Sequence, residues 1–166
     1  MGDLAEQAVE TGTDINLLCQ LVFTATTERV VTDLAAAGFD DLRPSHGYVF
    51  QGLLAGDTTI TQLAQRLGVS VQAVSKRVAE LDATGYLERR PDGTDGRARS
   101  IEITARGRAM LARVREAQDA VAEQIVEHLG ARDARELDRL LNSLCDLYGG
   151  LDVIADRRIR PSLGLI

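Results

Sequence analysis

Six arginines lie within the twenty residues from 89 to 108, which read RRPDGTDGRARSIEITARGR. Arginine presents several N–H donors in a planar fork that suits phosphate oxygens, and its side chain also fits the narrow, electronegative minor groove of DNA. Asp95 lies two residues before Arg97, where its carboxylate can hold the guanidinium and shape the turn. This pattern indicates a flexible basic segment suited to contact with a polyanion.

The positive charge of the chain is concentrated in its middle third. The 166 residues include 19 Lys and Arg against 25 Asp and Glu, which gives a formal net charge of −6. Residues 1–56 contribute −6, residues 57–108 contribute +2 and residues 109–166 contribute −2. Overall acidity argues against nonspecific binding to polyanions, whereas a local basic face is what contact with a phosphate backbone requires.

Two short helices joined by a glycine turn are predicted just before the arginine segment. Thr59 and Gln62 form a T-x-x-Q capping box, which is typical of a helix start. Gly68 turns the chain, and Ser70 is a strong N-cap for a helix that runs to about Thr84. This spacing is the signature of a helix-turn-helix.

The second of these helices has one apolar face and one slim polar face. At 100° per residue, four apolar side chains share one sector of about 80°: Val71, Val74, Val78 and Leu81. On the opposite side lie Gln72, Lys76, Ala79 and Ala83, with Ser75 at the edge. Gln and Lys can reach base edges in a major groove, and alanines permit close approach. The alternative is that Gln72 and Lys76 are simply solvated surface residues.

A β-hairpin is predicted next, with strands at residues 86–90 and 98–103 joined by PDGTDGR. A basic hairpin beside a helix-turn-helix forms a wing, so Arg97 and Arg99 are candidate DNA contacts. The alternative is that these two arginines only increase solubility. The remaining arginines of the segment either touch phosphates or merely flank the hairpin, and these are Arg89, Arg90, Arg106 and Arg108.

Longer helices flank this central region. We expect a helix at 13–37 with two apolar surfaces, a short one through Leu54, and two more at about 105–129 and from Asp133 onward. The last helix carries a wide leucine-rich stripe over residues 137–154, and the tail ending at residue 166 is apolar. One winged helix cannot cover this much apolar surface, so self-association is the economical explanation.

The central motif resembles the MarR family of winged helix-turn-helix transcriptional regulators. The residues that carry the resemblance are TITQLAQRLGVSVQAVSKRVAELDATGYLERRPDGTDGRARSIEITARG, with D-x-R at Asp95 and Arg97, followed by I-x-I-T. The stretch LRPSHGYVF is also similar to the family, and the order of helices matches over nearly the whole chain. The expected fold is therefore mainly α with a small β-hairpin wing. Three parts are expected: an N-terminal dimerisation helix and connector (1–44), a DNA-binding domain (45–104) and C-terminal dimerisation helices (105–166).

The resemblance implies an obligate homodimer that places two recognition helices in successive major grooves of a palindromic operator. It also implies a repressor that is released by a small, often anionic aromatic ligand or by oxidation of a cysteine. The implied DNA-binding residues are Ser70, Gln72, Ser75, Lys76, Arg77, Asp95, Arg97 and Arg99. Two positions depart from the family pattern: residue 96 is glycine where many relatives have a basic residue, and Val71 is apolar where polar residues are frequent.

The possible sensor residues each have a structural alternative. Cys19 lies in LLCQLVFTA, similar to the peroxide-sensing branch of the family, but no Lys, Arg or His lies within four residues to lower its pKa. A buried structural role is the alternative for Cys19, and Cys145 is expected to be a small core residue. His46 and Arg43 could line an effector pocket, or they could form an ordinary pair at a helix start.

Other classes of protein find little support in the sequence. It has none of the catalytic or phosphate-binding motifs HExxH, GxSxG, Walker loop or GxGxxG, and its two histidines and two distant cysteines suggest neither a metal site nor a disulfide framework. We expect a cytoplasmic protein that is not an enzyme, with no cofactor and no membrane span. One lysine against 18 arginines suggests a GC-rich bacterial genome. The rival hypotheses are a redox sensor that uses Cys19 and a winged helix that binds proteins rather than DNA.

Overall fold

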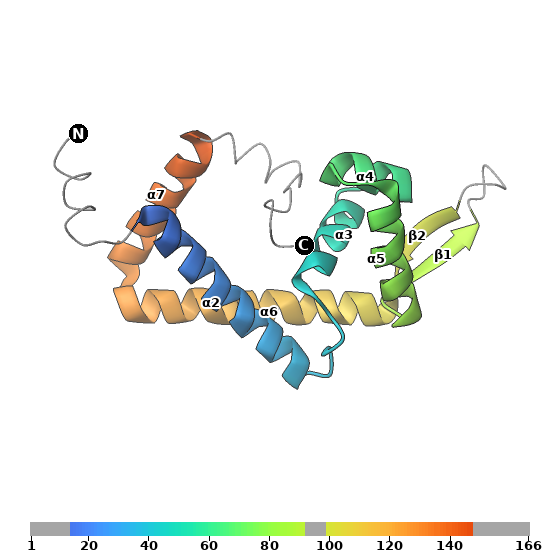
Figure 1. Cartoon of the computed structure of the whole chain (residues 1–166). Coiled ribbons are helices and arrows are strands. Elements are labelled where there is room, and N and C mark those ends of the chain that lie inside the picture. Colours follow the sequence, from blue (N-terminus) through green and yellow to red (C-terminus); the bar gives the residue numbers. More distant parts are fainter. Residues whose placement is uncertain (1–13, 92–98, 148–166) are drawn as a thin grey trace.

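The computed structural model describes residues 14–91 and 99–147, which form two lobes along one long helix (Figure 1). The elements, in chain order, are α2 (Ile15–Ala36), α3 (Pro44–Leu54), α4 (Ile60–Leu67), α5 (Val71–Ala83), β1 (Leu87–Pro91), β2 (Arg99–Ile103), α6 (Ala105–Leu129) and α7 (Ala131–Leu147). The expected mainly helical fold with a small hairpin is confirmed. We call α3 to β2 the winged-helix lobe, and α2, α6 and α7 the long-helix lobe.

The helix boundaries follow the capping residues in the sequence. Asp14 accepts a hydrogen bond from the backbone N–H of Asn16 at the start of α2, and Thr104 accepts one from Gly107 at the start of α6. Each of these bonds satisfies a backbone donor that has no partner within its helix. One boundary differs from the expectation, because α7 begins at Ala131 rather than at Asp133.

The core of the described chain is centred in the winged-helix lobe. The fully buried side chains come from α3, α4, α5, β1 and the turn after α5: Val49, Leu63, Val74, Val78, Leu81, Tyr86 and Leu87. Leu34 of α2 and Met110 of α6 complete this core, so the long helices are anchored on it. The hairpin pairs β1 with β2 in antiparallel register, with Leu87 opposite Ile103 and Arg89 opposite Ile101.

The long-helix lobe leaves much apolar surface exposed. In Figure 1, α2 crosses α6, and α7 lies at the end of α6 away from the winged-helix lobe. Large apolar side chains are exposed on α2 and on α7: Ile15, Leu17, Leu18, Leu21, Val22, Phe23, Leu137, Leu140, Leu141, Leu144 and Leu147. The part of the predicted leucine stripe beyond residue 147 and the C-terminal tail lie outside the described residues.

Tyr86 connects the two lobes at the start of α6. Its hydroxyl donates a hydrogen bond of 2.5 Å to Asp41 in the α2–α3 connection and accepts one of 3.1 Å from Arg106 of α6. The Arg106 guanidinium also lies over the Tyr86 ring, with its central carbon 4.7 Å from the ring centroid. Burial, and next the bond to Asp41, raise the pKa of Tyr86 to about 12.

The same junction requires a glycine on α6. A Cβ atom at Gly107 would lie 2.4 Å from the backbone oxygen of Tyr86 and 2.7 Å from Ile103. The Thr104 hydroxyl lies 2.6 Å from the backbone oxygen of Gly85 and donates to it. The first turn of α6 is therefore packed directly against the turn that follows α5, which fixes the position of α5 relative to α6.

Replacing Tyr86 with phenylalanine should destabilise the fold. The variant loses a hydrogen bond to a partly exposed carboxylate, so we expect the free energy of unfolding at pH 8 to fall by about 1.5 kcal/mol. Because the pKa of Tyr86 is raised in the folded state, its contribution is complete below about pH 10, the ordinary pKa of tyrosine, and is lost as the pH approaches about 12. The difference between wild type and variant should therefore shrink over this interval.

Tyr48→Phe is the matched control for this experiment. Tyr48 is half-buried in the same lobe, and no described residue gives its hydroxyl a hydrogen-bond partner, so its removal should change stability little. Urea denaturation followed by circular dichroism at several pH values measures both variants. Equal stabilities of the two variants at pH 8 would contradict the role given to Tyr86.

Candidate nucleic-acid interface

The helix-turn-helix is built by two capping interactions and a left-handed glycine. At the start of α4, the Thr59 hydroxyl accepts from the backbone N–H of Gln62 at 3.3 Å, and the Gln62 side chain accepts from the backbone N–H of Thr59 at 3.0 Å. Gly68 ends α4 with a φ of 64°, a conformation that favours glycine. The Ser70 hydroxyl then accepts from Ala73 N–H and starts α5. The predicted capping box, turn and N-cap are confirmed.

Helix α5 turns one face to the core and the other to solvent. Val74, Val78 and Leu81 are completely buried. The predicted outward side is exposed at Gln72, Lys76, Ala79 and Ala83. Among the other candidate DNA-binding residues, Ser70 is exposed, while Ser75 and Arg77 are half-buried. The exposed face is thus narrow, with one amide and one ammonium group, and it can approach another surface closely.

Val71 departs from the predicted helix phase. We expected it to point inward with the other valines, but its side chain is 51% exposed. Its position in the first turn of α5 explains the difference, because the core does not extend to the N-terminal end of this helix. The solvent-facing surface of α5 therefore includes an apolar side chain next to Gln72.

The buried side chain of His46 on α3 forms a hydrogen bond with Glu80 of α5. His46 Nδ1 accepts a hydrogen bond from the backbone N–H of Arg43, which leaves Nε2 to donate to Glu80 of α5 at 3.1 Å in the neutral tautomer. This hydrogen bond from His46 is the main cause that holds the pKa of Glu80 below its usual value. Both ring nitrogens of His46 have partners within the chain, so a ligand could use this side chain only by displacing one. Arg43 itself is exposed at the start of α3.

Four arginines of the basic segment, two on β1 and two on α6, have partners within the chain. Arg90 pairs with Glu88 at 2.9 Å and with Glu102 at 3.4 Å, and Arg89 Nε lies 3.6 Å from Asp82. Arg106 belongs to the Tyr86 junction, and Arg108 donates to the backbone oxygen of Ile103 at 2.6 Å. Each of these four arginines therefore has a partner within the chain, and the hypothesis that they touch phosphates stays a prediction.

The tip of the hairpin lies outside the described residues. This segment, 92–98, contains Asp95 and Arg97, so their predicted roles stay predictions. Arg99 begins β2 and pairs in register with Pro91, which places its backbone at the end of the hairpin nearest the tip. The hairpin lies beside α5 at the end of the molecule away from α7, so helix and hairpin can face one partner together (Figure 1).

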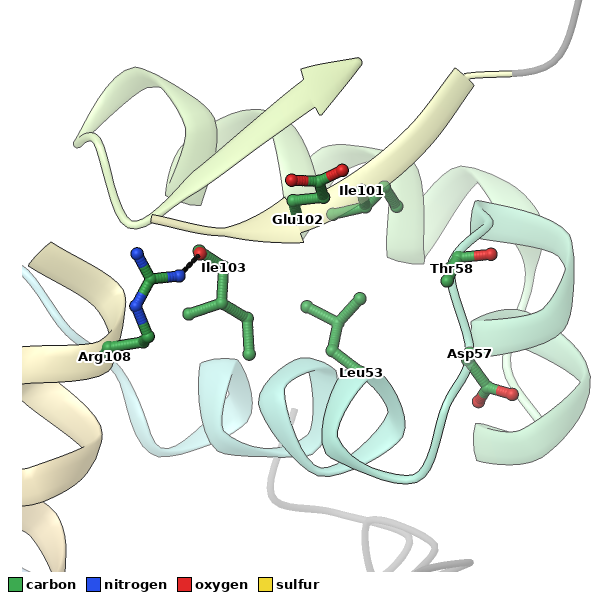
Figure 2. A pocket seen from close by; sticks show the side chains of 7 residues that line it. All are labelled: Leu53, Asp57, Thr58, Ile101, Glu102, Ile103 and Arg108. Atoms are coloured by element: carbon green, nitrogen blue, oxygen red, sulfur yellow. Dashed lines mark hydrogen bonds between the residues drawn. The ribbon is translucent and has the colours of Figure 1, made fainter. Parts of the chain in front are cut away.

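An open cavity of about 350 Å³ lies between α3 and β2 (Figure 2). Leu53 of α3 faces Ile103 of β2, while Arg108 and Thr58 lie at opposite ends. The remaining lining residues are Asp57, Ile101 and Glu102. The Thr58 backbone oxygen accepts from Ile101 N–H at 2.8 Å, which fixes β2 beside the loop before α4. The cavity is distinct from the predicted pair of His46 and Arg43.

Sequence reasoning missed the residues that hold α5 in place. Tyr86, Asp41 and Arg106 come from three separate segments, and no local spacing relates them. His46 was singled out, but as a ligand-binding residue rather than as the partner of Glu80. The expectation that Cys19 is buried is wrong for the single chain, because Cys19 is exposed on α2, and Cys145 is only half-buried. The redox hypothesis for Cys19 stays a prediction.

The described part of the chain holds neither a metal-binding cluster nor a membrane-spanning helix. Among residues 14–91 and 99–147, no group of three His, Cys, Asp or Glu side chains is placed to hold a metal ion. In the same residues, no helix combines the length and apolarity needed to cross a bilayer.

The chain is similar to solved structures over most of its length. The YusO protein from Bacillus subtilis is 18% identical, with a TM-score of 0.67 over 84% of this chain and 97% of that chain. A MepR mutant from S. aureus bound to an oligodeoxyribonucleotide is 16% identical, with a TM-score of 0.58 over 82% of this chain and 99% of that one. A Mycobacterium tuberculosis MarR family protein in complex with salicylic acid is 25% identical, with a TM-score of 0.56 over 80% and 96% of the two chains.

The sequence itself matches the MarR family model over residues 40–98, which contain α3, the helix-turn-helix and β1. No curated protein matches the sequence. The family match coincides with the segment that forms the helix-turn-helix here, and the structural similarity extends to the long helices on either side. Residues 40–98 are therefore similar in sequence to the MarR family, and the described chain has the fold of solved MarR family structures.

Proposed function

We propose that this protein is a cytoplasmic, homodimeric repressor that binds a palindromic operator and leaves it when a small ligand binds. The main support for this proposal is that one face of α5 is buried in the core and the opposite face is polar and exposed. Its inner face is completely buried at Val74, Val78 and Leu81, and its outer face presents Gln72 and Lys76 to solvent. A rigidly seated helix with a narrow polar face is suited to the major groove.

The DNA contacts divide between α5 and the hairpin. Ser70, Gln72, Ser75, Lys76 and Arg77 belong to the helix and its N-cap, and we assign them to base edges and adjacent phosphates in the major groove. The wing residues Asp95, Arg97 and Arg99 are assigned to the minor groove and its phosphates. The oligodeoxyribonucleotide complex of the similar MepR mutant supports DNA as the partner.

The proposed dimer would cover the apolar surface of the long-helix lobe. Leu140, Leu141 and Leu144 line one side of α7 and are exposed in the single chain, as are Leu18 and Val22 on α2. A contiguous apolar surface of this kind is typical of an interface between subunits. A second copy would also supply the second recognition helix that a palindromic operator requires.

The proposed effector is a small anionic aromatic compound. The salicylic acid complex of the similar Mycobacterium tuberculosis protein supports this class of ligand. Arg43 is exposed beside the buried His46 and can supply the cation for a carboxylate.

Substitutions on α5 and on the hairpin should affect DNA binding in different ways. Gln72→Ala should reduce discrimination among operator variants by about 1–3 kcal/mol and leave the salt dependence nearly unchanged, because a base contact is lost. Arg99→Ala should weaken binding to all sequences and reduce the slope of log K against log salt by about one, because a phosphate contact is lost. Fluorescence anisotropy titrations at several salt concentrations measure both effects.

Arg139→Ala is the control for these variants, since Arg139 is an exposed arginine on α7, at the far end of α6. It should change neither the affinity nor the slope. Unchanged operator preference in Gln72→Ala would contradict the assignment of α5 to the major groove. Heparin is a polyanion and should compete with DNA for the same surface. If heparin does not displace the bound partner, a winged helix that binds proteins rather than DNA is favoured instead.

A charge placed in the leucine stripe of α7 should break the dimer. Leu144→Asp would bury a carboxylate in the proposed interface, so the protein should become monomeric and lose most of its operator affinity. Asn142→Asp places the same charge on the opposite, polar side of α7 and should remain dimeric. Light scattering after size-exclusion chromatography measures the mass of each variant. A dimeric Leu144→Asp protein would argue against this interface.

Salicylate should weaken operator binding by the wild-type protein. Removing a charge-assisted hydrogen bond in Arg43→Ala should raise the salicylate concentration needed for release by about tenfold. Arg29→Ala, which removes an exposed arginine from α2, is the matched control and should respond like the wild type. If Arg43→Ala and Arg29→Ala respond equally, Arg43 has no part in ligand binding.

A further inference from the structure

Val71 is an exposed apolar side chain on the surface that we assign to DNA. It is the first residue of α5 and is 51% exposed, although Val74 and Val78 in the same helical sector are fully buried. Its neighbours in sequence, Ser70 and Gln72, are both exposed. In helix-turn-helix proteins, the N-terminal residues of the second helix are the ones that contact base edges.

The local structure does not require an apolar side chain at this position. Ser70 is the N-cap of α5. Val69 directly precedes this cap, and Val74 is the fourth residue of the helix. Val74 is buried in the core of the winged-helix lobe and Val69 is partly buried against that core, as in a hydrophobic staple at a helix start. The side chain of Val71 is therefore available for contact with a partner.

The isopropyl side chain of Val71 can distinguish bases only through apolar contact. It neither donates nor accepts hydrogen bonds, so it gains from a base edge only where that edge is apolar. In the major groove, the apolar feature of the base edges is the 5-methyl group of thymine. A branched aliphatic side chain half-exposed beside Gln72 is complementary to such a methyl group.

We propose that Val71 is a specificity-determining residue that packs against the 5-methyl group of a thymine in each half of the operator. This inference rests on the proposed DNA-binding function and adds a base preference to it. Gln72 contributes hydrogen bonds to a base edge, and Val71 contributes an apolar contact that depends on the methyl group alone. The two adjacent residues thus distinguish bases by different chemistry.

The test replaces each thymine of the operator with deoxyuridine, which lacks only the methyl group. The operator is first obtained by selecting bound fragments from random duplex DNA with the full-length protein. For the wild type, one deoxyuridine position in each half-site should weaken binding by about fourfold, the effect of exposing one carbon of this size. The Val71→Ala variant should bind the thymine and deoxyuridine forms of that site equally.

Gln72→Ala is the matched control on the neighbouring residue. It should lose discrimination at its own base pair but keep the full deoxyuridine effect at the position assigned to Val71. A methyl group should also act when another base carries it. At that position, 5-methylcytosine should bind the wild type more tightly than cytosine does, and Val71→Ala should bind both alike. Circular dichroism melting confirms that Val71→Ala is folded, as expected for a half-exposed residue.

The possible outcomes separate this inference from the function on which it rests. A wild type that binds the selected operator but tolerates deoxyuridine at every position overturns the role of Val71 and leaves the DNA-binding function intact. The inference is also overturned if Val71→Ala keeps the wild-type deoxyuridine effect, or if the selected half-sites contain no thymine. Failure to select any DNA contradicts the proposed function itself.

Discussion

The hydrogen bond from Tyr86 to Asp41 is the interaction on which the placement of the proposed DNA-binding surface depends. It joins the turn after α5 to the α2–α3 connection, and Arg106 brings the start of α6 to the same point. In the last turn of α5, the hydrogen bond between His46 and Glu80 joins the helix to α3. These hydrogen bonds and the buried valine face of α5 fix its orientation relative to α6. In the proposed dimer, α6 would set the distance between the two recognition helices.

Much of the fold could be predicted because its signals are local. The capping box at Thr59 and Gln62, the left-handed turn at Gly68 and the N-cap at Ser70 each act over three or four residues, and all are present as predicted. The outward face of α5 was also predicted, since the helical period alone separates Gln72 and Lys76 from the buried valines.

What could not be predicted depends on where the core ends and on contacts between distant segments. Val71 has the helical phase of a core residue but lies beyond the core, so periodicity alone placed it wrongly. The partners Asp41 and Tyr86 are 45 residues apart, and the sequence gives no sign of their contact. Cys19 is exposed because the apolar face of α2 around it lacks a covering element in the described chain.

In the proposed dimer, α5 of each subunit lies in a major groove, with the two grooves about one helical turn apart. Footprinting with dimethyl sulfate tests this directly, because the reagent methylates N7 of guanine in the major groove and N3 of adenine in the minor groove. We expect protection of guanine N7 in two patches about 10 base pairs apart, with protection of adenine N3 beside them from the proposed wing contacts. Protection confined to the minor groove, or a single major-groove patch, would contradict it.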